Sequence, residues 1–68
     1  MVHAFDELAK AAGAAADRKF KRVVAAANAS QHGSPAHNAL DAARQALLAE
    51  PAKFNADAAD EEAAQAAA

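Results

Sequence analysis

The sequence predicts an all-α fold: an antiparallel helical hairpin followed by a short acidic C-terminal helix. Alanine, the strongest helix former, supplies 26 of the 68 residues. The apolar residues recur every three or four positions, which is the period of an α-helix. Gly33 and the two prolines, Pro35 and Pro51, stand between these periodic stretches and mark the ends of helices. We therefore expect helices separated by short connections.

The first helix is expected over residues 3–29. Its apolar stripe has steps of three or four and consists of Phe5, Leu8, Ala12, Ala16, Phe20, Val23 and Ala27. Gly13 interrupts the stretch and costs about 1 kcal/mol relative to alanine inside a helix. A break at Gly13 is expected to move the stripe to another face, yet the stripe keeps its phase. We therefore predict one long helix, bent at most.

A second helix is expected over residues 35–50. Gly33 can adopt a positive φ, and Ser34-Pro35 is typical of an N-cap followed by proline at the first helical position. The apolar stripe of this helix consists of Ala36, Leu40, Ala43 and Leu47. The helix should end before Pro51, because a proline disfavours the helical conformation in the preceding residue. Short connections make the two helices antiparallel neighbours.

Residues 51–55 are interpreted as a connector, and a third helix is expected over residues 56–66 with Asn55 or Asp57 as its cap. Acidic residues in its first turns complement the helix dipole. After Phe54 no apolar side chain is larger than alanine, so packing contributes little to this helix. The three predicted helices make a single small domain over residues 1–68.

The small number of large apolar side chains indicates that the chain binds a protein partner. Only 11 apolar residues are larger than alanine, and there is no cysteine for a disulfide. Small scaffolds in this position usually gain stability from disulfides, metals or partners, and without cysteine a partner surface is the most available of these. We expect a homo-oligomer or docking on a larger host assembly. The residues predicted to bind the partner lie on the apolar stripes: Phe5, Leu8, Phe20, Val23, Leu40, Leu47 and Phe54.

Opposite charges are separated along the chain, within a net charge of -2. The basic band, residues 17–22, carries Arg18, Lys19, Lys21 and Arg22. The acidic turn carries Asp57, Asp60, Glu61 and Glu62. We predict an electrostatic contact between the two, either within one chain or with a neighbouring copy. Lys19 borders the apolar stripe, so its stem is expected to cover alanines with the ammonium group in water, or to meet a partner carboxylate.

Catalytic and metal chemistry are not expected. His32 and His37 are separated by Gly33, Ser34 and Pro35, so they do not share a helix face as the ligands of a helical zinc motif do. The third histidine, His3, is far away in the sequence. The two serines have no base at a defined spacing and are interpreted as cap and turn residues. The sequence therefore predicts no enzyme activity, no cofactor and no metal.

These observations favour a non-enzymatic interaction or assembly subunit, with a bacteriophage virion or capsid-associated protein as the working hypothesis. Two alternatives stay open: a small regulatory binder, of the inhibitor or antitoxin kind, and a nucleic-acid accessory protein that uses the basic band. The overall acidic balance argues against nucleic acid. The alanine-rich stripe has no tryptophan or tyrosine anchor for a membrane. The start of the chain has no apolar leader, so we expect a soluble protein in the cytoplasm or within a virion.

Overall fold

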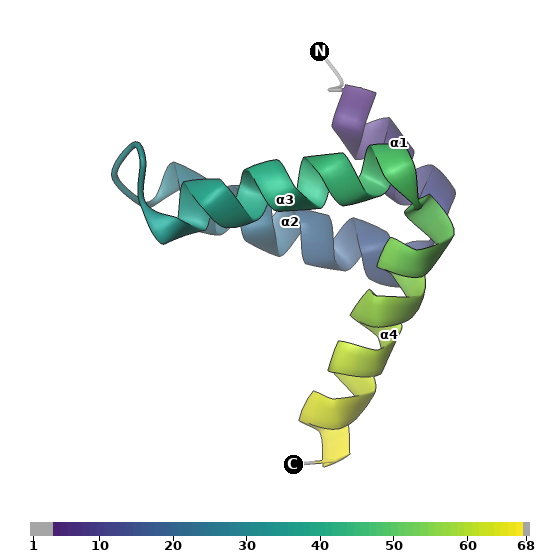
Figure 1. Cartoon of the computed structure of the whole chain (residues 1–68). Coiled ribbons are helices and arrows are strands. Elements are labelled where there is room, and N and C mark those ends of the chain that lie inside the picture. Colours follow the sequence, from purple (N-terminus) through teal and green to yellow (C-terminus); the bar gives the residue numbers. More distant parts are fainter. Residues whose placement is uncertain (1–3, 68) are drawn as a thin grey trace.

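The computed structural model describes residues 4–67, and this part of the chain folds into four α-helices without strands (Figure 1). The helices are α1 (Ala4–Ala12), α2 (Ala14–Asn28), α3 (Pro35–Ala49) and α4 (Pro51–Ala67). The all-α class predicted from alanine content and apolar periodicity is thereby confirmed. The predicted boundaries of the first and third helices are wrong, and each error has a local cause.

The first predicted helix is two helices, because the chain turns sharply at Gly13. Gly13 has φ 150° and ψ 170°, a conformation that only glycine adopts readily. A straight helix over residues 3–29 would be about 40 Å long, whereas the 15-residue α3 spans about 22 Å. The turn brings Phe5 and Ala9 of α1 back onto the core instead of leaving them beyond the end of α3. The stripe keeps its phase because both helices face the same core.

The predicted connector at residues 51–55 is helical. Helix α3 ends at Ala49, Glu50 adopts a non-helical conformation with φ -145°, and α4 starts directly at Pro51. Proline suits the first position of a helix, since it has no N–H group to leave unpaired there. The third predicted helix is therefore 17 residues long and begins before residue 56. At the other end of α3, Ser34 is the N-cap and Pro35 follows it, as predicted.

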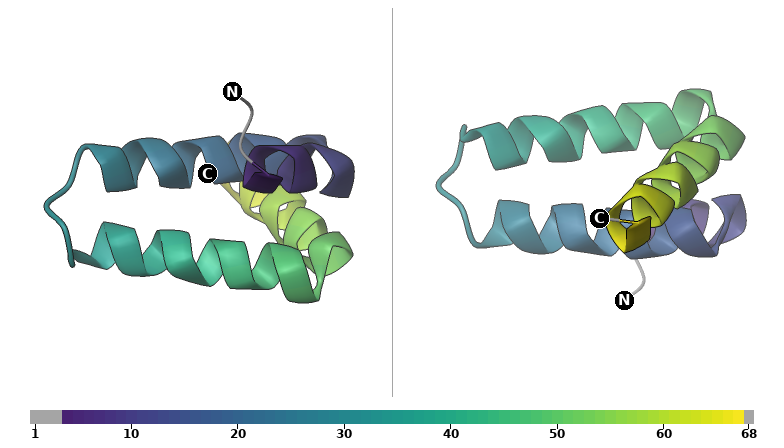
Figure 2. Two further views of the ribbon diagram at one scale, coloured as in Figure 1. Left: turned by 90° about the horizontal axis from the view of Figure 1, so that it is seen from above. Right: turned by 90° about the horizontal axis from the view of Figure 1, so that it is seen from below.

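Helices α2 and α3 lie side by side and run in opposite directions, joined by a loop in which Gly33 has φ 83° (Figure 2). Helix α4 leaves the far end of this pair and extends away from it (Figure 1). The core lies where the four helices meet. It combines Phe20, Leu40, Leu47 and Phe54 with buried alanines, and Phe5 packs on Phe20 with ring centroids 6.3 Å apart.

Candidate protein-binding groove

The residues predicted to bind a partner mostly hold the chain's own helices together. Leu47 and Phe20 are 0% and 2% exposed, and Leu40 and Phe54 are also buried. The side chains of Phe5, Leu8 and Val23 are half-buried. The predicted partner face therefore has to be corrected: Phe20, Leu40 and Leu47 are covered by this chain and offer a partner no surface. Of the seven residues, only Val23 and Phe54 line the groove described below.

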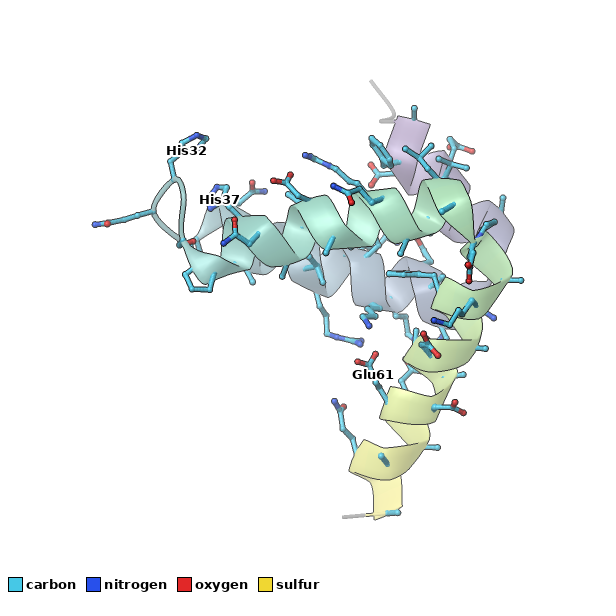
Figure 3. All side chains as sticks on the ribbon, in the orientation of Figure 1. His32, His37 and Glu61 are labelled. Carbon is cyan, nitrogen blue, oxygen red and sulfur yellow. The ribbon has the colours of Figure 1, made fainter. Side chains whose placement is uncertain are left out.

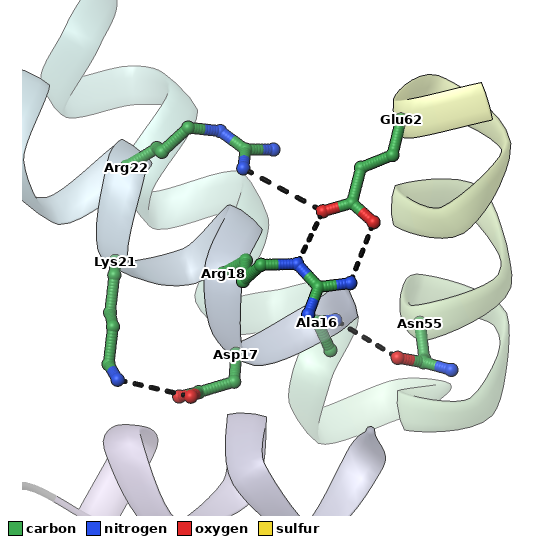
Figure 4. A network of polar contacts seen from close by, with 7 residues as sticks. All are labelled: Ala16, Asp17, Arg18, Lys21, Arg22, Asn55 and Glu62. Atoms are coloured by element: carbon green, nitrogen blue, oxygen red, sulfur yellow. Dashed lines mark hydrogen bonds and ion pairs between the residues drawn. The ribbon is translucent and has the colours of Figure 1, made fainter. Parts of the chain in front are cut away.

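One contact that positions helix α4 is a hydrogen bond that caps the N-terminus of α2. The backbone N–H of Ala16, in the first turn of α2, donates to Asn55 Oδ1 at 3.0 Å (Figure 4). Gly13 makes this possible, because a Cβ at residue 13 would overlap the Asn55 amide. The side chain of Asn55 therefore takes the part that an N-cap side chain usually plays, but from another helix. The predicted cap of the third helix, Asn55 or Asp57, is wrong, because both residues lie inside α4.

Two arginines of the basic band meet one carboxylate of the acidic turn. Arg18 donates from Nε and Nη2 to the two carboxylate oxygens of Glu62, at 2.7 and 2.8 Å (Figure 4). Arg22 Nη1 lies 4.0 Å from the same carboxylate. The hydrogen bonds from Arg18 lower the pKa of Glu62 below its ordinary value, and Glu62 raises the pKa of Arg18 in return. This bidentate pair links the middle of α4 to α2.

Lys19 of α2 contacts both a charged and an aromatic side chain of α4. Its ammonium lies 2.7 Å from a carboxylate oxygen of Glu61 and 5.2 Å from the centre of the Phe54 ring. Glu61 extends from α4 toward α2 in Figure 3. The partner carboxylate considered for Lys19 from the sequence is thus supplied by the same chain. A cation held over an aromatic face adds to the ion pair.

The other members of the two charged sets behave differently. Lys21 pairs with Asp17 of its own helix at 3.1 Å. Asp57 and Asp60 form no ion pair with any other residue between 4 and 67, and the same holds for Lys53. The structure therefore brings together Arg18, Arg22 and Lys19 with Glu61 and Glu62, and leaves Lys21, Asp57 and Asp60 outside this contact.

A groove of about 630 Å³ lies between α2, α3 and the first turns of α4. Alanines on one side of α3 form much of its surface, and we call it the α3 groove. The lining residues are Lys19 and Val23 from α2, Ala39, Ala42, Ala43, Gln45, Ala46 and Ala49 from α3, Glu50, and Lys53, Phe54 and Asp57 from α4. Small side chains allow another helix to approach closely, and the charged residues lie among the apolar ones.

The remaining polar residues do not group into a metal centre of three or more side chains in the part of the chain that the structure describes. His32 and His37 lie near each other at the α2–α3 connection, with ring centroids 5.3 Å apart, and His37 Nδ1 is 3.2 Å from Ser34 Oγ (Figure 3). No three His, Asp or Glu side chains between residues 4 and 67 are grouped to hold a metal ion. His3 lies outside the described residues. None of the four helices combines the length and apolar character needed to cross a bilayer.

The α3 groove was missed by sequence reasoning because it consists mostly of alanine. Ala39, Ala42, Ala46 and Ala49 recur at helical spacing, but alanine is so frequent in this chain that such a pattern is weak by itself. The groove forms only when α4 lies beside α2 and α3. That position of α4 depends on Asn55 and Gly13. Pro51 did indicate that α4 could begin directly after α3, because proline suits the first position of a helix as well as the position after its end.

Comparison with known proteins places the chain in no family: no protein-family model, no curated protein and no solved structure matches it.

Proposed function

We propose that the chain is a non-enzymatic interaction module, an assembly subunit whose α3 groove receives an α-helix of a protein partner. The observation that carries the proposal is the groove itself, which three helices border and which alanines, Val23 and Phe54 line. Amphipathic helices commonly bind in apolar grooves of this kind. Alanines on the floor of the groove suit a helix that approaches with small side chains of its own.

The contacts of the basic band support this proposal over a role with nucleic acid. Arg18, Lys19 and Arg22 face carboxylates of α4, and Lys21 faces Asp17. A phosphate backbone would have to displace these carboxylates before it could bind the same cations. A regulatory binder would use the same groove, and only the identity of its partner would distinguish it from an assembly subunit.

A crosslinking experiment tests the proposed use of the groove. A diazirine-bearing amino acid replaces Gln45, which is exposed and lines the groove, in one variant. It replaces Gln31, which is exposed in the α2–α3 loop, in a matched control. After irradiation in the native cells, we expect a covalent protein adduct from position 45 and none from position 31. Equal adducts at both positions, or no adduct at position 45, would contradict the proposal.

A further inference from the structure

We propose that His32 and His37, at the connection between α2 and α3, form a binding site for one Zn²⁺ ion. Neither histidine lines the α3 groove, so this site is separate from the proposed protein-binding surface and stands or falls independently of it. The argument uses three observations: the turn that brings the two rings together, the distance between the rings, and the contact of His37 with Ser34.

The connection between α2 and α3 contains a β-turn over residues 31–34. The Ser34 N–H donates to the Gln31 carbonyl at 3.1 Å, and Gly33 has φ 83°. A hydrogen bond from the fourth residue to the first, with a glycine of positive φ in the third position, is typical of a type II turn. His32 is the second residue of this turn. The turn therefore fixes the backbone that carries the His32 ring.

His37 lies in the first turn of α3, two residues after Pro35. Side chains of a helix point back toward its N-terminus, so the His37 ring lies toward the turn that carries His32. The ring centroids are 5.3 Å apart, and both rings lie on the same side of the connection (Figure 3). The sequence argued against a helical zinc motif because the two histidines share no helix face. In the structure the turn brings them together instead.

The distance between the two rings matches that of two imidazoles bound to one tetrahedral ion. A zinc–nitrogen bond is about 2.0–2.1 Å long and the centre of the ring lies about 1.1 Å beyond the nitrogen, so each centre is about 3.2 Å from the metal. At the tetrahedral angle of about 109°, the two centres are then about 5.2 Å apart. The observed 5.3 Å agrees with this value. Neighbouring ligands of a square-planar copper ion, at about 90°, would place the centres about 4.5 Å apart, so the distance favours zinc.

The hydroxyl of Ser34 is placed to orient the His37 ring. Ser34 is the N-cap residue of α3, yet its side chain makes no capping hydrogen bond to the helix. Its Oγ lies 3.2 Å from His37 Nδ1 instead. With the proton on Nδ1, the ring donates to this hydroxyl and Nε2 keeps its lone pair for a metal ion. Metal-binding histidines generally donate their second ring N–H to a neighbouring acceptor in this way.

The surroundings of the two rings leave the site open to a cation. From Val23 to Leu40 the sequence has no lysine or arginine to repel a metal ion, and no carboxylate to compete with the imidazoles for it. The connection lies at the end of the molecule away from α1 and α4 (Figure 1). The C-terminus of α2 and the N-terminus of α3 meet here, so their opposite partial charges largely offset each other. Water takes the remaining positions of the tetrahedron, as it does in zinc sites with fewer than four protein ligands.

Titration of the purified full chain with zinc chloride tests the site. By isothermal titration calorimetry we expect one Zn²⁺ per chain. His32→Ala and His37→Ala should each raise the Kd at least about tenfold, because each removes a ligand. His3→Ala is the matched control and should keep the Kd of the native chain. A native chain that binds no Zn²⁺, or equal Kd values for the native chain and the first two variants, would overturn the proposal.

Nuclear magnetic resonance identifies the atoms that bind the ion, since the chain also has nine carboxylate side chains that can hold Zn²⁺. Addition of zinc should shift the ring nitrogen signals of His32 and His37 together and leave those of His3 in place. Acidification to about pH 5.5 should reverse these shifts, because a protonated imidazole cannot bind a metal ion. Zinc-dependent shifts confined to the acidic residues of α4 would instead place the ion there and overturn the proposal.

Substitution of Ser34 tests the orientation of the His37 ring. Ser34→Ala should raise the Kd for Zn²⁺ about tenfold, because the ring loses the acceptor for its Nδ1 proton. Ser34→Thr keeps the hydroxyl and should return the Kd close to that of the native chain. Circular dichroism checks that both variants keep their helicity. The same Kd for the native chain and for Ser34→Ala would contradict the part assigned to Ser34.

Discussion

The contacts of helix α2 with α3 and with α4 differ in their chemistry. Toward α3 it presents Phe20 to Leu40 and Leu47, and all three side chains are buried. Toward α4 it presents the Ala16 amide and the exposed basic band, and Phe54 is the one large apolar side chain of α4 in the core. Buried apolar surface stabilises without fixing a direction, whereas hydrogen bonds and ion pairs fix direction and stabilise little when exposed. The α2–α3 contact therefore maintains the fold, and the α2–α4 contact sets the shape of the groove.

Truncation of Phe20 should give the largest loss in the free energy of unfolding. Phe20→Ala is expected to cost about 3–5 kcal/mol, because the side chain is almost fully buried and packs on Phe5. Stability for a chain of this length is about 3–10 kcal/mol, so much of the variant should be unfolded. Urea denaturation followed by circular dichroism measures the change.

Leu48→Ala is the matched control for this prediction. Leu48 is also a large apolar residue, but it is 64% exposed. Its truncation should change the free energy of unfolding by less than about 0.5 kcal/mol. Equal losses for Phe20→Ala and Leu48→Ala would show that the core is elsewhere.

The turn between α1 and α2 should be the next most sensitive point. Gly13→Ala is expected to cost about 1–3 kcal/mol through its backbone conformation alone. The new Cβ also overlaps the Asn55 amide and should displace it. Gly33→Ala is the comparison, because residue 33 also has a positive φ but its Cβ would meet open space. A smaller loss at residue 13 than at residue 33 would rule out the overlap.

Loss of the cap supplied by α4 should have a smaller effect. Asn55→Ala is expected to lower the free energy of unfolding by about 1 kcal/mol, since the Ala16 N–H loses its acceptor. Asn38→Ala, an exposed position on α3, should be close to neutral. In the Asn55→Ala background the cost of Gly13→Ala should also fall, because the overlap has gone. Strict additivity of the two changes would contradict the contact between them.

The exposed ion pair should give the smallest effect. Glu62→Gln removes the pair with Arg18 and should lower the Tm slightly at neutral pH and low salt. Because folding lowers the pKa of Glu62, the contribution of the pair is present above the ordinary glutamate range. It is lost as the pH falls through the lowered value. The Tm difference should vanish in acid and at high salt, whereas a difference that persists in both would exclude an electrostatic origin.

The sequence was sufficient to predict the helical class and the start of α3, because both depend on local chemistry. Alanine content and apolar period indicate helices, and Ser34-Pro35 defines where α3 begins. The break at Gly13 could not be predicted from periodicity. Both sides of the break face one core, so the stripe keeps its phase, and the turn itself lies in the backbone conformation of Gly13, which has φ 150°.

The position of α4 was harder to predict because it depends on contacts distant in the sequence. Asn55 and Ala16 are 39 residues apart, and Asn55 also has a plausible local use as a cap. The opposite charges of the basic band and the acidic turn pointed to their proximity. They did not indicate which carboxylates would pair, since Asp57, Asp60, Glu61 and Glu62 are equivalent by charge. Only the direction of α4 selects Glu61 and Glu62.

The cap from Asn55 also makes one amide proton a reporter of the whole arrangement. The N–H groups in the first turn of a helix have no acceptor in their own helix, so they normally exchange with solvent quickly. The Ala16 N–H instead donates to a side chain of α4, so its exchange must wait until α4 separates from α2. The hydrogen-exchange rate of this single amide would therefore report how often α4 separates from α2, even while the core around Phe20 stays closed.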